Sequence, residues 1–504
     1  MRTLTSQEIE ILSANGCFAD DWQQIQVTDP FDARRVRGVN FCGRIELGSN
    51  AGQIEVVDGF KRPCGLRNVT LSNVRIGNDS LVEDTTLVAC TVADGEDLVI
   101  PVLNEAGDGN VLLSPQLTSQ LAAMQIRYAS DETFTERLRD LFRQVEGYDA
   151  RMVSIGHNTC ISGAGKLVNT HVGNYCHIGE NVILEGCYVT ESSTVTNGFM
   201  AEHSLFFANT FVANGEACAA FCGPFSASHH KGSLLIGVEV SFYNAGSATN
   251  FSNHAYKMGP LHYGTLQRGS KTASGGHLLL PAQVGPFSMC MGKIQTHPDT
   301  RRMPFSYIIA SGDEAMLIPA RAMLTVGLFR DVEKWPKRDK RPLDDRPSLI
   351  SHQWLSPYTL QAIRQGKEDL EALLNGHPDT ETYRYHGCRI RRHSLMTGIK
   401  IYDLALRLAG NPAPTEPWSD LGGMLLPLAD EKALVEAVKS GKIGTLAALN
   451  DALRDIFVRN DAPVEFDAEA KKEWYSFVAL DARKEFELGD VDEDVLEQFL
   501  KKLQ

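Results

Sequence analysis

Twelve residues at positions 253–264, NHAYKMGPLHYG, hold two histidines, a lysine and two tyrosines without the hydrophobic period of a helix or strand. An imidazole titrates near neutrality, so it can deprotonate a hydroxyl or amine that attacks an acyl carbonyl. We predict His254 as the first candidate for this general base and His262 as the second. The predicted substrate contacts within the same stretch are Asn253, Tyr256, Lys257 and Tyr263.

A purely structural interpretation of this stretch stays open. Gly259, Pro260 and Gly264 are residues that turn a backbone, and the two tyrosines can cover an exposed face. Lys257 then points into solvent with its stem along the surface. The residue types alone do not choose between a reactive site and a tight corner.

Cationic side chains continue after this stretch, in RGSKTASGGH at positions 268–277. We predict that Arg268, Lys271 and His277 contact substrate, because basic groups among glycines suit the phosphates of a nucleotide, a coenzyme or a sugar phosphate. The GSKTASGG segment lacks the GxxxxGK[ST] order of a phosphate loop, so a nucleoside triphosphate is not specifically indicated.

No metal site is predicted. The eleven cysteines show neither the CxxC pairs of zinc sites nor the dense framework of small secreted domains, so we expect reduced, buried thiols. The spacing of eight residues between His254 and His262 does not by itself indicate shared metal ligation.

A repeat of six residues surrounds these candidates. Aliphatic residues recur at this spacing in each of several groups, which is neither a helical nor an ordinary strand period. We expect each hexad to supply one short strand and one turn, with three hexads per coil and stacked coils sharing one core. The clearest groups are Ile155, Ile161 and Leu167, then Val172, Ile178 and Leu184, then Val189, Val195 and Ala201. The predicted fold class is mainly β, a parallel β-helix.

Helical patterns interrupt and follow the repeat. Thr5 and Glu8 have the spacing of a capping box, and Ser356 with Pro357 resembles a helix start. The expected regions are an N-terminal helix with the first coils at 1–112, a helical insertion at 113–150, the main β-helix at 151–330, a linker at 331–349 and an α-helical C-terminal region at 350–504.

Composition limits the partners. The net charge of −14 argues against a general nucleic-acid binder, whose affinity depends on neutralising phosphates. No stretch has about 18 uncharged apolar residues, so no membrane span is expected. The acidic start MRTLTSQEIEILSANG lacks the basic and apolar regions of a secretory signal, and we expect a cytoplasmic protein.

The run NFSNHAYKMGPLHYGTLQRGSKTASGGHLLLPAQVGPFSMCMGK, with THPDTRRMPFSYIIASGD after it, resembles an uncharacterised bacterial family known as a domain of unknown function. The resemblance extends over most of the chain. The hexads are also similar to those of left-handed β-helix transferases with hexapeptide repeats. That likeness, and not the period, implies a left-handed coil, a homotrimer with sites between subunits and a single histidine base. Residues 1–65 are too short for the nucleotidyltransferase half of related bifunctional enzymes.

Two classes of function follow. The first is acyl transfer from an acyl-CoA cosubstrate to a sugar, nucleotide-sugar-like or amino acceptor, with a histidine base. The alternative is a noncatalytic ligand-binding or scaffold protein. A metal-dependent enzyme like the γ-class carbonic anhydrases is less favoured, because the arginine, aspartate and glutamine pattern of that family is not found.

Overall fold

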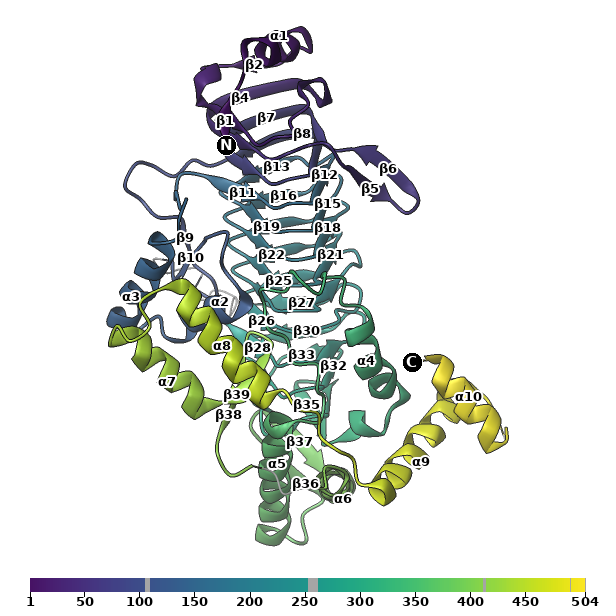
Figure 1. Ribbon diagram of the computed structural model, residues 1–504. Coiled ribbons are helices and arrows are strands. Elements are labelled where there is room, and N and C mark those ends of the chain that lie inside the picture. The colour runs from purple at the N-terminus through teal and green to yellow at the C-terminus, as the bar shows by residue number, and fades with distance from the viewer. Residues whose placement is uncertain (105–108, 253–261, 411–413, 490, 504) are drawn as a thin grey trace. The chain divides into compact units, whose positions relative to one another are not determined.

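The computed structural model describes residues 1–104, 109–252, 262–410, 414–489 and 491–503, with its helices and strands labelled in Figure 1. The chain divides into two compact units. Unit 1 comprises Met1–Gly237, Lys340–Ser348 and Val438–Ala448. Unit 2 comprises Val238–Asp339, Leu349–Ala437 and Leu449–Gln504.

Unit 1 begins with a helix and a set of long strands. In α1 (Ser6–Ala14) the predicted capping box is confirmed: the Thr5 hydroxyl accepts from the Glu8 N–H at 3.2 Å, and the Glu8 carboxylate accepts from the Thr5 N–H at 2.7 Å. Strand β7 (Gly65–Ile76) pairs in parallel with β4 (Val36–Leu47) and β8 (Leu81–Ala89). The other elements of this part are β1 (Arg2–Thr3), β2 (Phe18–Ala19), β3 (Ile25–Val27), β5 (Gln53–Val57), β6 (Phe60–Pro63), β9 (Val99–Ile100), β10 (Val111–Leu112) and the 3₁₀ helices η1 (Trp22–Gln24) and η2 (Ala33–Arg35).

Short strands separated by turns follow, in successive rows (Figure 1). From β11 to β22, each strand pairs in parallel with the third strand after it, so that Ile155 lies opposite Val172 and Val172 opposite Val189. These three residues are the first members of three successive groups with six-residue spacing, and all are buried. The strands are β11 (Val153–Ile155), β12 (Cys160–Ser162), β13 (Lys166–Val168), β14 (His171–Val172), β15 (His177–Ile178), β16 (Ile183–Glu185), β17 (Tyr188–Val189), β18 (Thr194–Thr196), β19 (Met200–Glu202), β20 (Leu205–Phe206), β21 (Phe211–Ala213), β22 (Glu216–Cys218), β23 (Phe221–Cys222), β24 (Ala227–Ser228) and β25 (Leu234–Ile236).

Unit 2 continues with short parallel strands and then changes direction. Strand β34 pairs in parallel with β32 and antiparallel with β35, which starts a mixed sheet. The strands are β26 (Val238–Val240), β27 (Asn250–Ser252), β28 (Gly264–Leu266), β29 (Lys271–Thr272), β30 (His277–Leu279), β31 (Gln283–Val284), β32 (Met289–Met291), β33 (Lys293–Ile294), β34 (Tyr307–Ser311), β35 (Glu314–Ile318), β36 (Thr382–Tyr385), β37 (Cys388–Arg391), β38 (Trp418–Leu421) and β39 (Met424–Pro427).

The remaining helices occupy segments without the six-residue repeat. Ser356 caps α5 with Pro357 in its first turn, as the Ser-Pro pair predicts. The helices are α2 (Ser119–Arg127), α3 (Glu132–Arg143), η3 (Arg321–Leu324), α4 (Val326–Lys337), α5 (Pro357–Gly376), α6 (Arg392–Leu408), α7 (Leu428–Lys439), α8 (Leu446–Asn460), α9 (Ala468–Glu485) and α10 (Glu493–Leu503).

The predicted fold class, a mainly β chain folded as a left-handed β-helix, is wrong. The described residues are mixed α/β, with one large, mostly parallel sheet of 27 strands and ten α-helices. A six-residue period specifies short strands, turns and buried positions, but it specifies neither a hand nor the structure of segments outside the repeat. Those segments have helical caps and apolar stripes, and they form the helices that make the fold mixed α/β.

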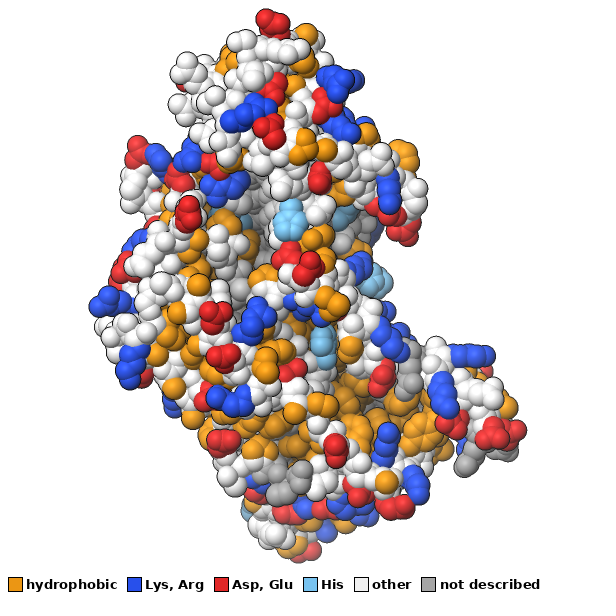
Figure 2. All heavy atoms as spheres, in the orientation of Figure 1, with side chains coloured by type: hydrophobic (Ala, Val, Ile, Leu, Met, Phe, Trp, Pro, Cys, Tyr) orange, Lys and Arg blue, Asp and Glu red, His pale blue; other side chains and the backbone are white. Residues whose placement is uncertain are grey.

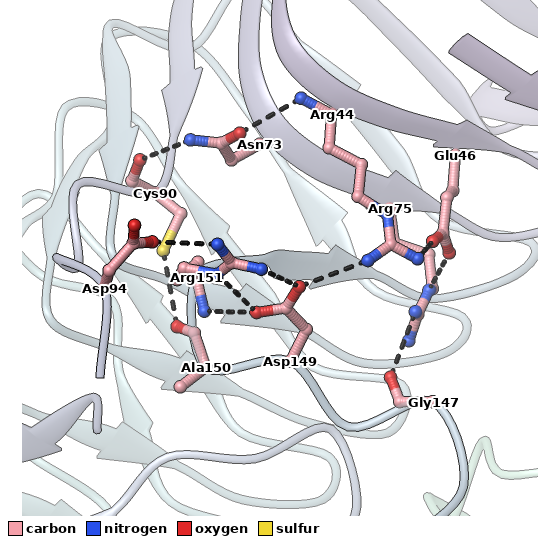
Figure 3. Close-up of polar contacts among 10 residues, drawn as sticks. All are labelled: Arg44, Glu46, Asn73, Arg75, Cys90, Asp94, Gly147, Asp149, Ala150 and Arg151. Carbon is pink, nitrogen blue, oxygen red and sulfur yellow. Dashed lines mark hydrogen bonds and ion pairs between the residues drawn. The ribbon is translucent and has the colours of Figure 1, made fainter. Parts of the chain in front are cut away.

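Acidic and basic side chains are interspersed on the face that Figure 2 presents. In unit 1, a group of charged side chains forms a network (Figure 3). Glu46 on β4, whose side chain is 4% exposed, lies 2.5 Å from both the Arg44 and Arg75 guanidinium groups. Asp149 contacts Arg44 at 3.2 Å and Arg151 at 3.1 Å. The Asp149–Arg44 ion pair attaches the loop at residue 149 to β4, and Arg75 of β7 donates to the Gly147 carbonyl of the same loop at 3.1 Å.

Candidate functional site

Asn253, His254, Tyr256 and Lys257 lie outside the described residues. His262 and Tyr263 directly precede β28 and are half-buried.

His277 begins β30, opposite Asn250 on one neighbouring strand and Lys293 on the other. Burial, and then the charge of Lys293, lower the pKa of the His277 imidazole. This favours the neutral ring, which is a hydrogen-bonding group more than a partner for an anion.

The Arg268 side chain is buried within unit 2. Its Nη2 donates to the Ser351 carbonyl at 2.5 Å, and its Nε lies 3.6 Å from the Asp420 carboxylate. The guanidinium carbon is 4.8 Å from the centre of the Phe242 ring. Arg268 therefore binds other parts of unit 2.

Lys271 is three residues further along the chain, and it lines a cavity of about 460 Å³ within unit 2. This volume lies in the range of pockets that hold small organic molecules. The cavity is bounded by strands β29, β32 and β34, by helix α4 and by the C-terminal end of α9. Arg268, His262, Tyr263 and His277 do not belong to its lining.

Three side chains in one row form the sheet side of the cavity. Lys271 on β29 lies opposite Met289 on β32, and Met289 lies opposite Tyr307 on β34. In parallel strands, residues in register point to the same face. The row therefore presents an amine, a thioether and a phenol side by side.

A tight turn beside this row brings aromatic rings to the cavity. Gly269 has φ of +76°, and a Cβ atom there would lie 2.2 Å from the Phe287 ring. The Phe287 ring stacks on Phe305 at 5.1 Å between centroids, and Trp335 of α4 lies 6.0 Å away. Because these rings are packed against one another, Phe287 cannot move aside for a larger residue at 269.

Helices α4 and α9 hold the opposite side of the cavity together. The Thr325 hydroxyl caps α4 by accepting from the Leu328 N–H at 3.3 Å. Asp481 of α9 accepts from the Val326 N–H at 3.0 Å and from Arg321 at 3.0 Å. An acidic group at the start of a helix is also favoured by the helix dipole.

The charged groups near Lys271 are predominantly basic. Lys271 forms an ion pair with Asp331, whose other oxygen lies 3.6 Å from Arg330 Nε. Burial, and then the charges of Arg330 and Lys334, lower the pKa of Lys271 to about 8. The adjacent Asp331 carboxylate opposes that shift because it favours the ammonium form. One carboxylate thus lies among three basic side chains.

In the part of the chain that the structure describes, no group of three or more His, Cys, Asp or Glu side chains is arranged to hold a metal ion. The cavity instead combines Lys271 and Arg330 with Met289, Tyr307 and Trp335. Such a lining suits an organic molecule with an anionic group and an apolar body.

Sequence reasoning identified Lys271 but missed Tyr307, Arg330, Asp331 and Glu485, which also line the cavity. One signal was present: Lys271, Met289 and Tyr307 are spaced by 18 residues, which is three hexads. The residues of α4 and α9 had no such signal, because tertiary packing brings them to the strands.

None of the helices within the described ranges has the length and hydropathy of a membrane span.

One similar protein is an uncharacterized protein of Treponema pallidum (strain Nichols), 22% identical over 432 residues. The match covers 69% of this chain and 59% of that relative, so the chain spans about three fifths of the relative's length. The family described as "Domain of unknown function (DUF4954)" matches residues 1–91, 84–186 and 176–374. The predicted membership of an uncharacterised family is confirmed, and the chain belongs to the DUF4954 family.

Proposed function

We propose that this protein binds a small organic anion in the cavity of unit 2. The observation that carries the proposal is the place of Lys271, which lines a cavity of about 460 Å³ together with Arg330. A buried ammonium is unfavourable without anionic partners. Here the Asp331 carboxylate pairs with Lys271 and lies near Arg330, while the charge of Lys334 also acts on Lys271, and we call these four residues the cationic end.

The apolar part of the ligand would lie against the remaining lining. Met289 and Trp335 present a thioether and an indole, both of which pack well against hydrocarbon or aromatic groups. A carboxylate or phosphate held by Lys271 and Arg330 would then fix the orientation of the molecule. This division of roles is common in small-molecule sites.

Titration calorimetry of the full chain tests this function, with sodium octanoate and acetyl-CoA as separate probes. We expect binding of at least one probe, and we expect Lys271→Met to weaken it about 10-fold, as loss of one charge-assisted hydrogen bond implies. Lys293→Met is the matched control, because exposed Lys293 on β33 lies outside the cavity lining. Absence of binding by the unmodified chain, or equal binding by Lys271→Met, would reject the proposal.

Acyl transfer from an acyl-CoA to a sugar or amino acceptor is a narrower form of the same proposal. The coenzyme is a phosphate-bearing molecule, and Lys271 was predicted from the sequence to bind such a ligand. His254 and His262 stay the candidate bases. Release of free CoA thiol in the presence of an acceptor, with its loss in His254→Ala or His262→Ala, would support transfer. Sedimentation analysis would test the proposed homotrimer.

A further inference from the structure

The end of the cavity opposite Lys271 has an excess of carboxylates. It is formed by Arg321, Asp481 and Glu485 beside Tyr307, and we call these three charged residues the anionic end. The Arg321 guanidinium carbon lies 5.9 Å from the centre of the Tyr307 ring, which places this group over β34. Two carboxylates face one guanidinium here, whereas the cationic end has three basic groups and one carboxylate.

The two carboxylates of the anionic end differ in their contacts. Both oxygens of Asp481 are in use, one with Arg321 and one with the Val326 N–H, each at 3.0 Å. Glu485 is exposed, and within the described ranges no basic side chain forms an ion pair with it. Glu485 is therefore the carboxylate that can receive a cationic group of a ligand.

The strands determine how far apart the two ends lie. Lys271 and Tyr307 are in register on β29 and β34, with β32 between them. Neighbouring strands are about 4.8 Å apart, so the two positions are separated by about 10 Å. Met289 occupies the interval. The row therefore runs from a basic group, over an apolar side chain, to the anionic end.

We propose that the ligand is an elongated zwitterion, with an acid group at the cationic end, an amine at Glu485 and an apolar chain over Met289. The inference rests on the proposed function because it concerns the same cavity. An extended chain advances about 1.2 Å per bond, so about eight bonds span the interval. The ligand class is that of long-chain amino acids whose amine and carboxyl group are at opposite ends.

Calorimetry of the full chain with a series of probes tests this ligand class. The series is 4-aminobutanoate, 6-aminohexanoate and 8-aminooctanoate, with octanoate and octylamine as probes that carry one charge each. We expect 8-aminooctanoate to bind about 5-fold more tightly than octanoate, which is the upper range for one exposed ion pair. We expect 4-aminobutanoate to be the weakest amino acid, because it cannot reach both ends.

A pair of variants assigns the effect to Glu485. Glu485→Gln should remove the 5-fold advantage of 8-aminooctanoate and leave octanoate binding unchanged. Glu487→Gln is the control, because Glu487 is exposed two residues away and is not part of the lining. This variant should keep the advantage.

The failures of the two proposals are distinguishable. If octanoate and 8-aminooctanoate bind equally to the unmodified chain, the zwitterion inference is overturned while anion binding stands. If 8-aminooctanoate keeps the same affinity advantage over octanoate in Glu485→Gln as in the unmodified chain, Glu485 does not bind the amine and the inference fails. If no member of the series binds but acetyl-CoA does, the zwitterion inference fails and anion binding stands; if neither the series nor acetyl-CoA binds, the proposed function fails as well.

Discussion

Lys271 on β29 and Asp331 on α4 form an ion pair inside the cavity of unit 2, although 60 residues separate them in the chain. The pair joins a strand of the parallel stack to the helix that covers it. Arg330 lies 3.6 Å from the same carboxylate, and the charge of Lys334 also acts on Lys271. The ionisation of Lys271 is therefore sensitive to each of its neighbours.

Substitution Asp331→Asn should lower the pKa of Lys271 below its value of about 8. The change removes the carboxylate that pairs with the ammonium and leaves burial, Arg330 and Lys334 in place. NMR of ¹³C-methylated lysines, titrated with and without the substitution, measures this pKa, and Lys271→Arg identifies its signal. A Lys271 signal that titrates with ordinary lysines, near pH 10.4, would contradict the description of the site.

Substitution Gly269→Ala should destabilise unit 2 by about 3 kcal/mol, since a left-handed backbone and a close contact both oppose a Cβ atom. The nearest atom would be in the Phe287 ring, at 2.2 Å. Gly275→Ala is the matched control: its φ is +69°, but no atom lies within 4 Å of the added carbon. It should cost only about 1 kcal/mol. Chemical denaturation measures the free energy of unfolding of both variants. Equal losses of stability would show that the Phe287 ring moves aside for the added carbon.

Acid should destabilise unit 1 through His171. Burial, and then the charge of Arg75, lower the pKa of this imidazole to about 3, and its Nδ1 accepts from the Ser154 N–H at 3.0 Å. Between pH 3 and the ordinary value near 6.5, the unfolded chain binds a proton that the native chain does not. The contribution of His171 to the free energy of unfolding is therefore fully present above pH 6.5. It falls by about 1.4 kcal/mol per pH unit as the pH decreases toward 3.

His171→Asn should remove that part of the pH dependence of unfolding, measured by urea denaturation at a series of pH values. The matched variant is His230→Asn, because His230 is exposed in the same unit. It should leave the slope unchanged. A slope that survives in His171→Asn would assign the acid sensitivity to other groups.

The network of Figure 3 should depend strongly on one of its carboxylates and weakly on another. Glu46→Gln leaves Arg44 and Arg75 facing each other without a shared anion, and a loss of about 2 kcal/mol is expected from breaking a largely buried ion pair. Asp94 contacts Arg151 at 2.8 Å, but its side chain is 89% exposed. Asp94→Asn should therefore leave the unfolding midpoint unchanged. If Glu46→Gln and Asp94→Asn lowered the free energy of unfolding equally, burial would not determine how much each carboxylate of this network stabilises the protein.

The sequence by itself determined where unit 1 has short strands and which side chains are buried in them. Ile155, Val172 and Val189 are in register because turns of fixed length separate apolar positions. The capping box at Thr5 and the N-cap at Ser356 were equally readable, since a cap depends on residues a few positions apart. These are local rules, and they do not specify the hand of a repeat or its fold class.

Only the tertiary structure decided which cations of the 268–277 segment face a cavity. Arg268 and Lys271 are three residues apart and chemically similar in sequence, yet Arg268 is buried against Ser351 and Phe242 whereas Lys271 lines the space beneath α4. Residues 331–337, placed by sequence in a linker, belong to α4, although Pro336 lies in the helix. Asp331, Asp481 and Glu485 reach the site through helix packing, which depends on contacts between distant segments and has no period in the sequence.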